Sequence, residues 1–235
     1  MKMSDSNIPW AREWGDEERQ KRFAGRFSGF HSSLVSPGQK IKTDLPIVLI
    51  MSDSILGGVC WKTIQAMLRG KANVSYIQHP HHCKNIDKWL DIWGIDNWDH
   101  YHTIFYFDGM HGFPPRVSEE EHQELTPKII ERLKNVTKNV VWGNCTPLPE
   151  MKQGEKNSKL GPNSKEQELT NQRVINRNKS LKKEMEETNT TLVDLYSLLK
   201  PIQSQVQPKG DSHFNQFGSI IMATAISQEL LKLLD

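Results

Sequence analysis

The stretch that decides the fold is Ile47-Val-Leu-Ile-Met51, followed by Ser52-Asp-Ser-Ile-Leu56 and Gly57-Gly58. A short apolar run that passes directly into a polar turn is typical of a strand buried on both faces of a parallel sheet. The carboxyl ends of such strands face a shared crevice where ligands bind. Ser54 is therefore predicted to lie at the crevice end of the first strand.

A histidine comes from the other end of the chain, in Gly210-Asp-Ser-His213-Phe214, just before the last apolar run. A serine and a histidine that meet in one crevice are the minimum for nucleophilic acyl transfer. Each residue alone has an ordinary explanation, because Ser and Asp are favoured helix caps and a loop histidine is commonly a surface residue. The pairing of Ser54 with His213 therefore carries the hypothesis.

Apolar runs and amphipathic runs alternate from Leu45 onward. The alternation predicts an α/β fold, a three-layer α/β/α sandwich with a mainly parallel sheet of about five strands. The expected strands are Ile47–Met51, Val74–Ile77, Thr103–Phe107, Asn139–Trp142 and Thr191–Leu195. The expected helices are Trp61–Leu68, Ile86–Trp93, Glu119–Leu133, Glu166–Glu187 and Phe217–Leu234.

Two segments do not fit this alternation. Residues 1–43 form a charged N-terminal extension, either an aromatic clasp on the domain or a partner-binding arm, and residues 44–235 form the α/β domain. The stretch Pro147–Pro162 is irregular and directly follows a strand. It is interpreted either as a lid over the crevice or as a surface insertion.

Composition restricts the class of protein. The chain has 235 residues and a net charge of +2 with no basic stripe, so one domain is expected and nucleic acid is not an expected partner. No secretory signal and no run of membrane-spanning length are seen, so no membrane association is expected. Three cysteines without metal-site spacing are typical of reduced thiols in a cytoplasmic protein.

Four blocks at predicted strand ends resemble the SGNH (GDSL-type) hydrolase family, over residues 45–234. The resemblance is closest to a subgroup with Gly-Leu-His-Asp in its oxyanion block. The matching stretches are Leu49–Ile55, Gly109-Met110-His111, Thr146–Glu150, Val174–Asn178, Val193–Tyr196 and His213-Phe214 with Gly218. The resemblance implies a flavodoxin-like sandwich that hydrolyses esters, with Ser54 as nucleophile, His213 as base and no cofactor. It also implies an oxyanion site formed at Cys83, Gly109 and His111.

The sequence departs from this family at several positions. Ser52 and Gly112 replace a family glycine and a subgroup aspartate, and the second block holds Cys83 where a glycine is usual. The family reads Asp-x-x-His in its last block, whereas Asp211 lies only two residues before His213. An extended backbone would aim the Asp211 carboxylate away from the ring. Three alternatives follow: a turn restores the contact and Asp211 serves, a Ser54–His213 dyad works with a backbone carbonyl orienting His213, or activity is lost.

The sequence supports a metal site or a cysteine nucleophile less strongly than it supports the serine–histidine pair. His79, His81, His82 and Cys83 are suitable zinc ligands by type, but they are contiguous, and no metal is expected. Cys60 or Cys145 as nucleophile is a further alternative. The function predicted is that of a serine esterase acting on a small or O-acylated substrate. The rival is a catalytically impaired SGNH-like domain that binds a ligand or a protein.

Overall fold

The computed structural model describes residues 44–79, 82–92, 101–114, 116–149 and 170–234. The predicted N-terminal extension lies outside these ranges, and so does the irregular stretch from position 150 onward. The predicted zinc-ligand candidate His81 also lies outside them.

The centre of the domain is a five-stranded parallel sheet in the order β2-β1-β3-β4-β5. The strands are β1 (Ile47–Ser52), β2 (Asn73–Gln78), β3 (Thr103–Phe107), β4 (Asn139–Gly143) and β5 (Thr191–Val193). Strand β1 pairs with both β2 and β3, and all of the pairs are parallel. The predicted α/β fold with about five parallel strands is therefore confirmed, and Ser52 ends a central strand.

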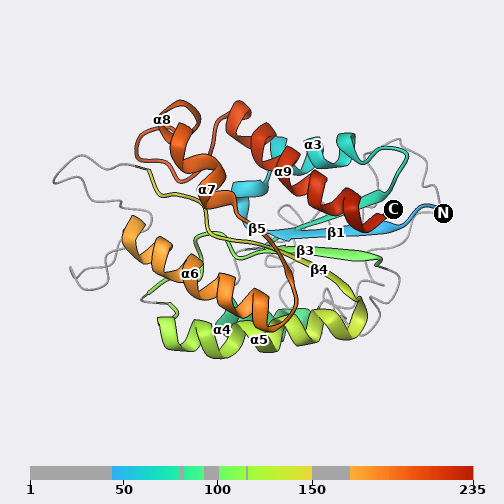
Figure 1. Ribbon diagram of the computed structural model, residues 1–235, viewed down its shortest axis with the longest axis horizontal. Helices are drawn as coiled ribbons and strands as arrows, with labels where there is room; N and C mark the ends of the chain where they lie inside the picture. Colours follow the sequence, from blue (N-terminus) through green and yellow to red (C-terminus); the bar gives the residue numbers. More distant parts are fainter. Residues whose placement is uncertain (1–43, 80–81, 93–100, 115, 150–169, 235) are drawn as a thin grey trace, which may run out of the picture.

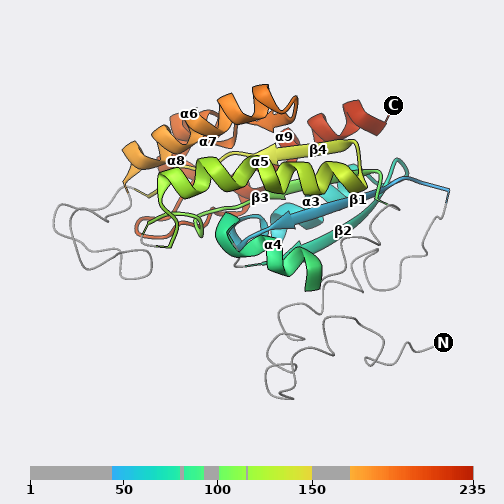
Figure 2. The same ribbon diagram turned by 90° about the horizontal axis from the view of Figure 1, so that it is seen from below.

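Helices cover both faces of the sheet (Figure 1). Helices α3 (Val59–Met67) and α9 (Gln216–Leu234) lie on one face, while α4 (Cys83–Ile92), α5 (Glu119–Val136) and α6 (Asn171–Glu187) lie on the other. Figure 2 shows the last three side by side. Alternate side chains of β1 enter the two cores: Val48 and Ile50 pack with α3 and α9, and Leu49 and Met51 pack beneath α4 and α5.

Among the described helices, α9 is long and apolar enough to cross a membrane, by length and composition only. Its side chains Met222, Ala223, Ile226 and Leu230 are buried in the core shared with α3. A helix buried in a protein core has the same composition, because its neighbours on the sheet and on α3 require apolar side chains. We interpret α9 as a core helix on this basis.

The chain between the last strand and His213 differs from the sequence prediction. The strand ends at Val193 rather than Leu195, and three short helical segments follow: α7 (Leu195–Leu199), η6 (Lys200–Ile202) and α8 (Gln203–Val206). Asp194 causes the early end, because its carboxylate accepts the Ser197 N–H at 3.0 Å and so caps α7. These helices carry the chain back to the crevice end of the sheet (Figure 1).

Candidate active site

The turn after β1 presents Ser54 at the surface. Asp53 caps the short helix η3 (Ser54–Leu56), and its Oδ1 accepts the Ile55 N–H at 2.8 Å. Gly57 packs closely against this turn, because a Cβ at that position would lie 3.0 Å from the Ser54 carbonyl oxygen. The capping that the sequence suggested is thus carried by Asp53, which leaves the exposed Ser54 side chain for another role.

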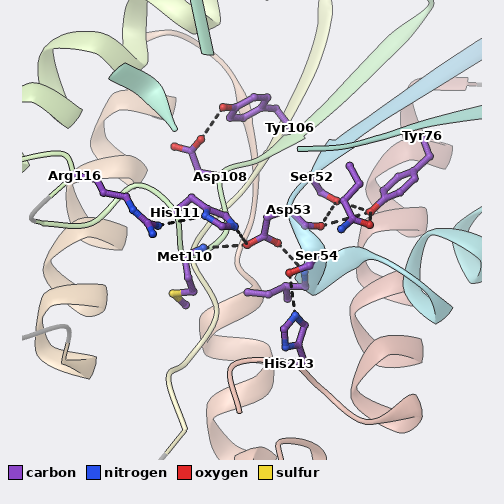
Figure 3. A network of polar contacts seen from close by, with 12 residues as sticks. Ser52, Asp53, Ser54, Tyr76, Tyr106, Asp108, Met110, His111, Arg116 and His213 are labelled. Atoms are coloured by element: carbon purple, nitrogen blue, oxygen red, sulfur yellow. Dashed lines mark hydrogen bonds and ion pairs between the residues drawn. The ribbon is translucent and has the colours of Figure 1, made fainter. Parts of the chain in front are cut away.

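Ser54 and His213 meet at this turn, as Figure 3 shows. The Ser54 Oγ lies 2.9 Å from His213 Nε2. On the other side of the ring, His213 Nδ1 lies 2.7 Å from Asp211 Oδ1. This is the serine–histidine–carboxylate order of a hydrolase triad. The side chains of His213 and Asp211 are 49% and 47% exposed, so water reaches the ring from one side.

The contact of Asp211 with His213 depends on a turn. Gly210 has a φ of +70°, and the Asp211 N–H donates to the Pro208 carbonyl at 3.2 Å. The Asp211 Oδ1 then accepts the His213 backbone N–H at 3.0 Å as well as facing the ring. The backbone here is therefore not extended, and a turn brings the Asp211 carboxylate into contact with the His213 ring. The role of Asp211 as a triad acid stays a prediction. Glycine permits the positive φ without steric cost.

Two glutamines hold the His213 loop, and no sequence pattern pointed to either of them. Gln207 Nε2 donates to the Pro147 carbonyl at 3.0 Å and to the Ser212 carbonyl at 3.2 Å. Gln203 Nε2 donates to the Leu148 carbonyl and to Gln207 Oε1. Both side chains are buried. They fix the His213 loop to the chain that leaves β4, which is required for a constant distance between His213 and Ser54.

The Asp53 carboxylate joins the serine turn to the loop after β3. Its Oδ2 accepts the Met110 N–H at 3.1 Å while Oδ1 holds Ile55. Gly109 has a φ of +62°, and a Cβ there would lie 1.7 Å from Asp53 Oδ2. Only glycine fits this approach. Burial raises the pKa of Asp53 from 3.8 to about 7, and the two backbone donors limit the rise.

This pKa predicts a pH dependence of stability. The folded protein binds the Asp53 proton more tightly than the unfolded chain, so the stabilisation is fully present below pH 3.8 and is lost as the pH rises to about 7. The unfolding free energy is expected to fall by up to about 4 kcal/mol from this group, at 1.36 kcal/mol per pKa unit. Asp53→Asn should flatten the curve in denaturant titrations from pH 5 to 8.

Asp108→Asn is the matched control for that experiment. Burial alone would raise the pKa of Asp108, but His122 and the Tyr106 hydroxyl, at 2.6 Å, bring it below the ordinary value. Asp108 is therefore ionised in both states across this pH range, and its replacement should remove only the small part of the slope that its negative charge adds by raising the pKa of Asp53. Parallel curves for the wild type and Asp53→Asn would contradict the assignment.

His111 lies beside Asp53 and belongs to the loop after β3 that also carries Gly109 and Met110 (Figure 3). Its Nε2 is 3.9 Å from Asp53 Oδ2, and its Nδ1 is 3.5 Å from the Arg116 guanidinium. Burial and the charge of Arg116 lower the pKa of His111. The lowered pKa favours the neutral ring, and because a guanidinium can only donate, a hydrogen bond from Arg116 to Nδ1 assigns the ring proton to Nε2. Sequence reasoning identified His111 but not Arg116.

Arg177, from the Val174–Asn178 block, supports this loop from α6. Its Nε is 2.6 Å from Glu119 Oε2, its Nη1 donates to the Gly112 carbonyl, and its guanidinium lies 4.3 Å above the Phe113 ring. The next residue, Asn178, bonds both the N–H and the carbonyl of Cys145 at the end of β4. One turn of α6 therefore fixes the loops after β3 and β4.

Cys83 is the first residue of α4, and its side chain is buried in the core beneath that helix. Its N–H belongs to the first turn, whose donors have no acceptor within the helix. Its use as an oxyanion donor stays a prediction. Burial raises the pKa of the Cys60, Cys83 and Cys145 thiols to about 12, which disfavours a cysteine nucleophile. Over the described ranges, no three metal-ligating side chains come together.

No protein-family model and no curated protein sequence matches this chain. Solved structures do match it in fold. A lipase/acylhydrolase from Enterococcus faecalis aligns with a TM-score of 0.62 and 15% identity, over 79% of this chain and 95% of that one. The acetylxylan esterase Axe2 from Geobacillus stearothermophilus aligns with 0.59 and 13%, over 79% and 94%. A protein described as a putative platelet activating factor from Streptococcus pneumonia aligns with 0.64 and 14%, over 97% and 100%. At these identities the matches show an SGNH-like fold.

Proposed function

We propose that this protein is a serine esterase that hydrolyses a small or O-acylated substrate through an acyl-enzyme. The observation that carries the proposal is the connected series Ser54 Oγ–His213 Nε2 at 2.9 Å and His213 Nδ1–Asp211 Oδ1 at 2.7 Å. Solved proteins of the same fold named as acylhydrolase and esterase support the reaction class. The exposed Ser54 suits an acyl group presented on a larger molecule.

In this reaction His213 Nε2 takes the Ser54 proton while Oγ forms a bond to the ester carbonyl carbon. The carbonyl π electrons move to oxygen and give a tetrahedral oxyanion. When the oxyanion collapses, the alcohol leaves with the proton from His213. Water then attacks the acyl-enzyme by the same route and releases the acid. Asp211 keeps the Nδ1 proton in place, so that Nε2 is free to accept.

The oxyanion needs hydrogen-bond donors at its position. The candidates are the Ser54 N–H, the Cys83 N–H and the Nε2–H of His111, on the loop that Gly109 allows to approach Asp53. We propose His111 as the side-chain donor because its neutral ring, with Arg116 at Nδ1, carries the proton on the correct nitrogen. Neither a metal nor a cofactor is required for these steps.

His111→Ala is expected to lower kcat by about 10²- to 10³-fold with little change in KM, the usual loss for one oxyanion donor. Steady-state kinetics on p-nitrophenyl acetate measure both constants. His102→Ala is the matched control, since His102 lies at the opposite end of β3, where it contacts Thr103 at 2.9 Å. An unchanged kcat for His111→Ala would leave His111 with a packing role only.

The function is tested by labelling the wild-type chain with a fluorophosphonate probe and measuring hydrolysis of p-nitrophenyl acetate. Covalent labelling of Ser54, located by mass spectrometry of the peptide, together with turnover supports the esterase. A folded protein with neither property overturns it and favours the rival, a binding domain without activity.

A further inference from the structure

Two side chains hold the carbonyl group of Asp53, directly before the proposed nucleophile. The Ser52 hydroxyl donates to the Asp53 carbonyl oxygen at 3.0 Å, and the Tyr76 hydroxyl lies 3.5 Å from the same oxygen. The two hydroxyls are 3.4 Å apart. Figure 3 shows them together on the side of Asp53 away from His111. Ser52 is the position where the resembled family has glycine.

The cluster is rigid and dry. Ser52 is 0% exposed and Tyr76 is 5% exposed. The Tyr76 ring stacks on Trp61 of α3, with the ring centres 4.9 Å apart and the planes within 3°. Ser52 and Gln78 are paired in register between β1 and β2, which places Tyr76 on the same face of the sheet as Ser52. Both side chains are therefore held by the sheet and by α3, and the Tyr76 hydroxyl lies 3.5 Å from both the Asp53 carbonyl oxygen and Gln78 Oε1, which share its one proton.

The hydrogen bonds to the Asp53 carbonyl determine the direction of the Ser54 N–H. In a trans peptide group the C=O and the N–H of the following residue point in opposite directions. Holding the Asp53 carbonyl toward Ser52 and Tyr76 turns the Ser54 N–H away from them. Among the described residues, none accepts that N–H. A hydrogen bond to the carbonyl also polarises the N–H and strengthens it as a donor.

We infer that Ser52 and Tyr76 are positioning residues, which orient the Ser54 N–H as an oxyanion donor by fixing the Asp53–Ser54 peptide group. The inference rests on the proposed esterase function and adds two residues to its machinery. Neither side chain touches the substrate. Because Ser52 is fully buried, it is not an alternative nucleophile. It positions the proposed nucleophile, Ser54.

The test uses Ser52→Ala and Tyr76→Phe, with Ser75→Ala as the matched control. Ser75 is also a buried serine of the sheet, next to Tyr76 in β2 but on the opposite face. Ser52→Ala should lower kcat by about tenfold, a part of the 10²- to 10³-fold that complete loss of one donor costs. Tyr76→Phe should cost about threefold, since its contact is longer. KM should stay within about twofold for both variants.

A second measurement separates positioning from general damage. Trifluoroacetone adds to an activated serine and forms a hemiketal whose oxyanion resembles the reaction intermediate. Its inhibition constant should rise by the same factor as kcat falls, since both depend on the donor. The pH profile of kcat/KM should keep the wild-type shape, because both substitutions leave the Ser54–His213 contact intact.

The outcomes are distinct. A wild-type chain that neither labels nor hydrolyses removes the esterase proposal, and this inference with it. An active wild type whose Ser52→Ala and Tyr76→Phe variants keep kcat within twofold overturns the positioning role alone. A kcat loss without weaker trifluoroacetone inhibition, or with an altered pH profile of kcat/KM, overturns it as well, because the damage then lies outside the oxyanion donor. Thermal melts of all three variants serve as the check on folding.

Discussion

Ser54→Ala is expected to lower kcat for p-nitrophenyl acetate by roughly 10⁶-fold, the loss seen when a triad serine is removed. The loss should be this large because, over the part of the chain that the structure describes, the Ser54 hydroxyl is the one that contacts His213 Nε2. Ser52 is fully buried, and burial raises the pKa of the Cys60 and Cys145 thiols to about 12, so neither is a thiolate at neutral pH. Fluorophosphonate labelling should disappear with the activity.

Ser212→Ala is the control for this experiment. Its hydroxyl lies in the same loop as His213, while the interaction that Ser212 contributes is made by its carbonyl, which the substitution leaves in place. The control should keep kcat within about twofold. Residual labelling of Ser54→Ala, or a loss smaller than a hundredfold, would place the nucleophile at another residue.

Asp211→Ala is expected to lower kcat by about 10³-fold, less than the roughly 3 × 10⁴-fold cost of losing a triad aspartate in a buried site. The carboxylate accepts from both His213 Nδ1 and the His213 backbone N–H, so the alanine variant loses the ring's orientation and its charge partner together. The smaller loss follows from exposure, because water reaches the half-exposed ring and takes over part of the interaction.

Asp211→Asn should cost far less, between about tenfold and a hundredfold. A triad asparagine is usually harmful because its NH₂ group faces the ring and forces the wrong tautomer. Here one oxygen, Oδ1, accepts both hydrogen bonds, so an amide can keep its oxygen at that position and its nitrogen toward water. Measurements of kcat/KM against pH for Asp211→Ala and Asp211→Asn test whether the asparagine variant loses less activity than the alanine variant. Equal losses near 10⁴-fold would show that the negative charge itself is essential.

The sequence pattern was sufficient to predict the fold and to identify Ser54 and His213 as candidate site residues. Strand and helix positions depend on local hydrophobic periodicity, so β1, β3 and α5 begin at the residues expected for them. Parallel strands bring their carboxyl ends to one edge, and this rule alone predicted that Ser54 would lie at the crevice. The contact with His213 followed from the resemblance of both blocks to one family.

The short helices α7 and α8 and the end of β5 were missed for a different reason. The segment Thr191–Leu195 has strand-like composition, but a single cap at Asp194 stops the strand and starts a helix. Capping is decided by one hydrogen bond and contributes little to periodicity. Such boundaries are the least visible feature in a single sequence.

Only the tertiary structure decided how the site is held. The direction of Asp211 depends on a φ of +70° at Gly210, and the raised pKa of Asp53 depends on burial beneath the loop of Gly109 and Met110. The supports from Tyr76 to Asp53, from Arg177 to Gly112 and from Gln207 to Pro147 join residues 23 to 65 positions apart. Sequence patterns report what neighbouring residues do to one another. These interactions, by contrast, form only when the packed core brings distant segments within hydrogen-bond distance.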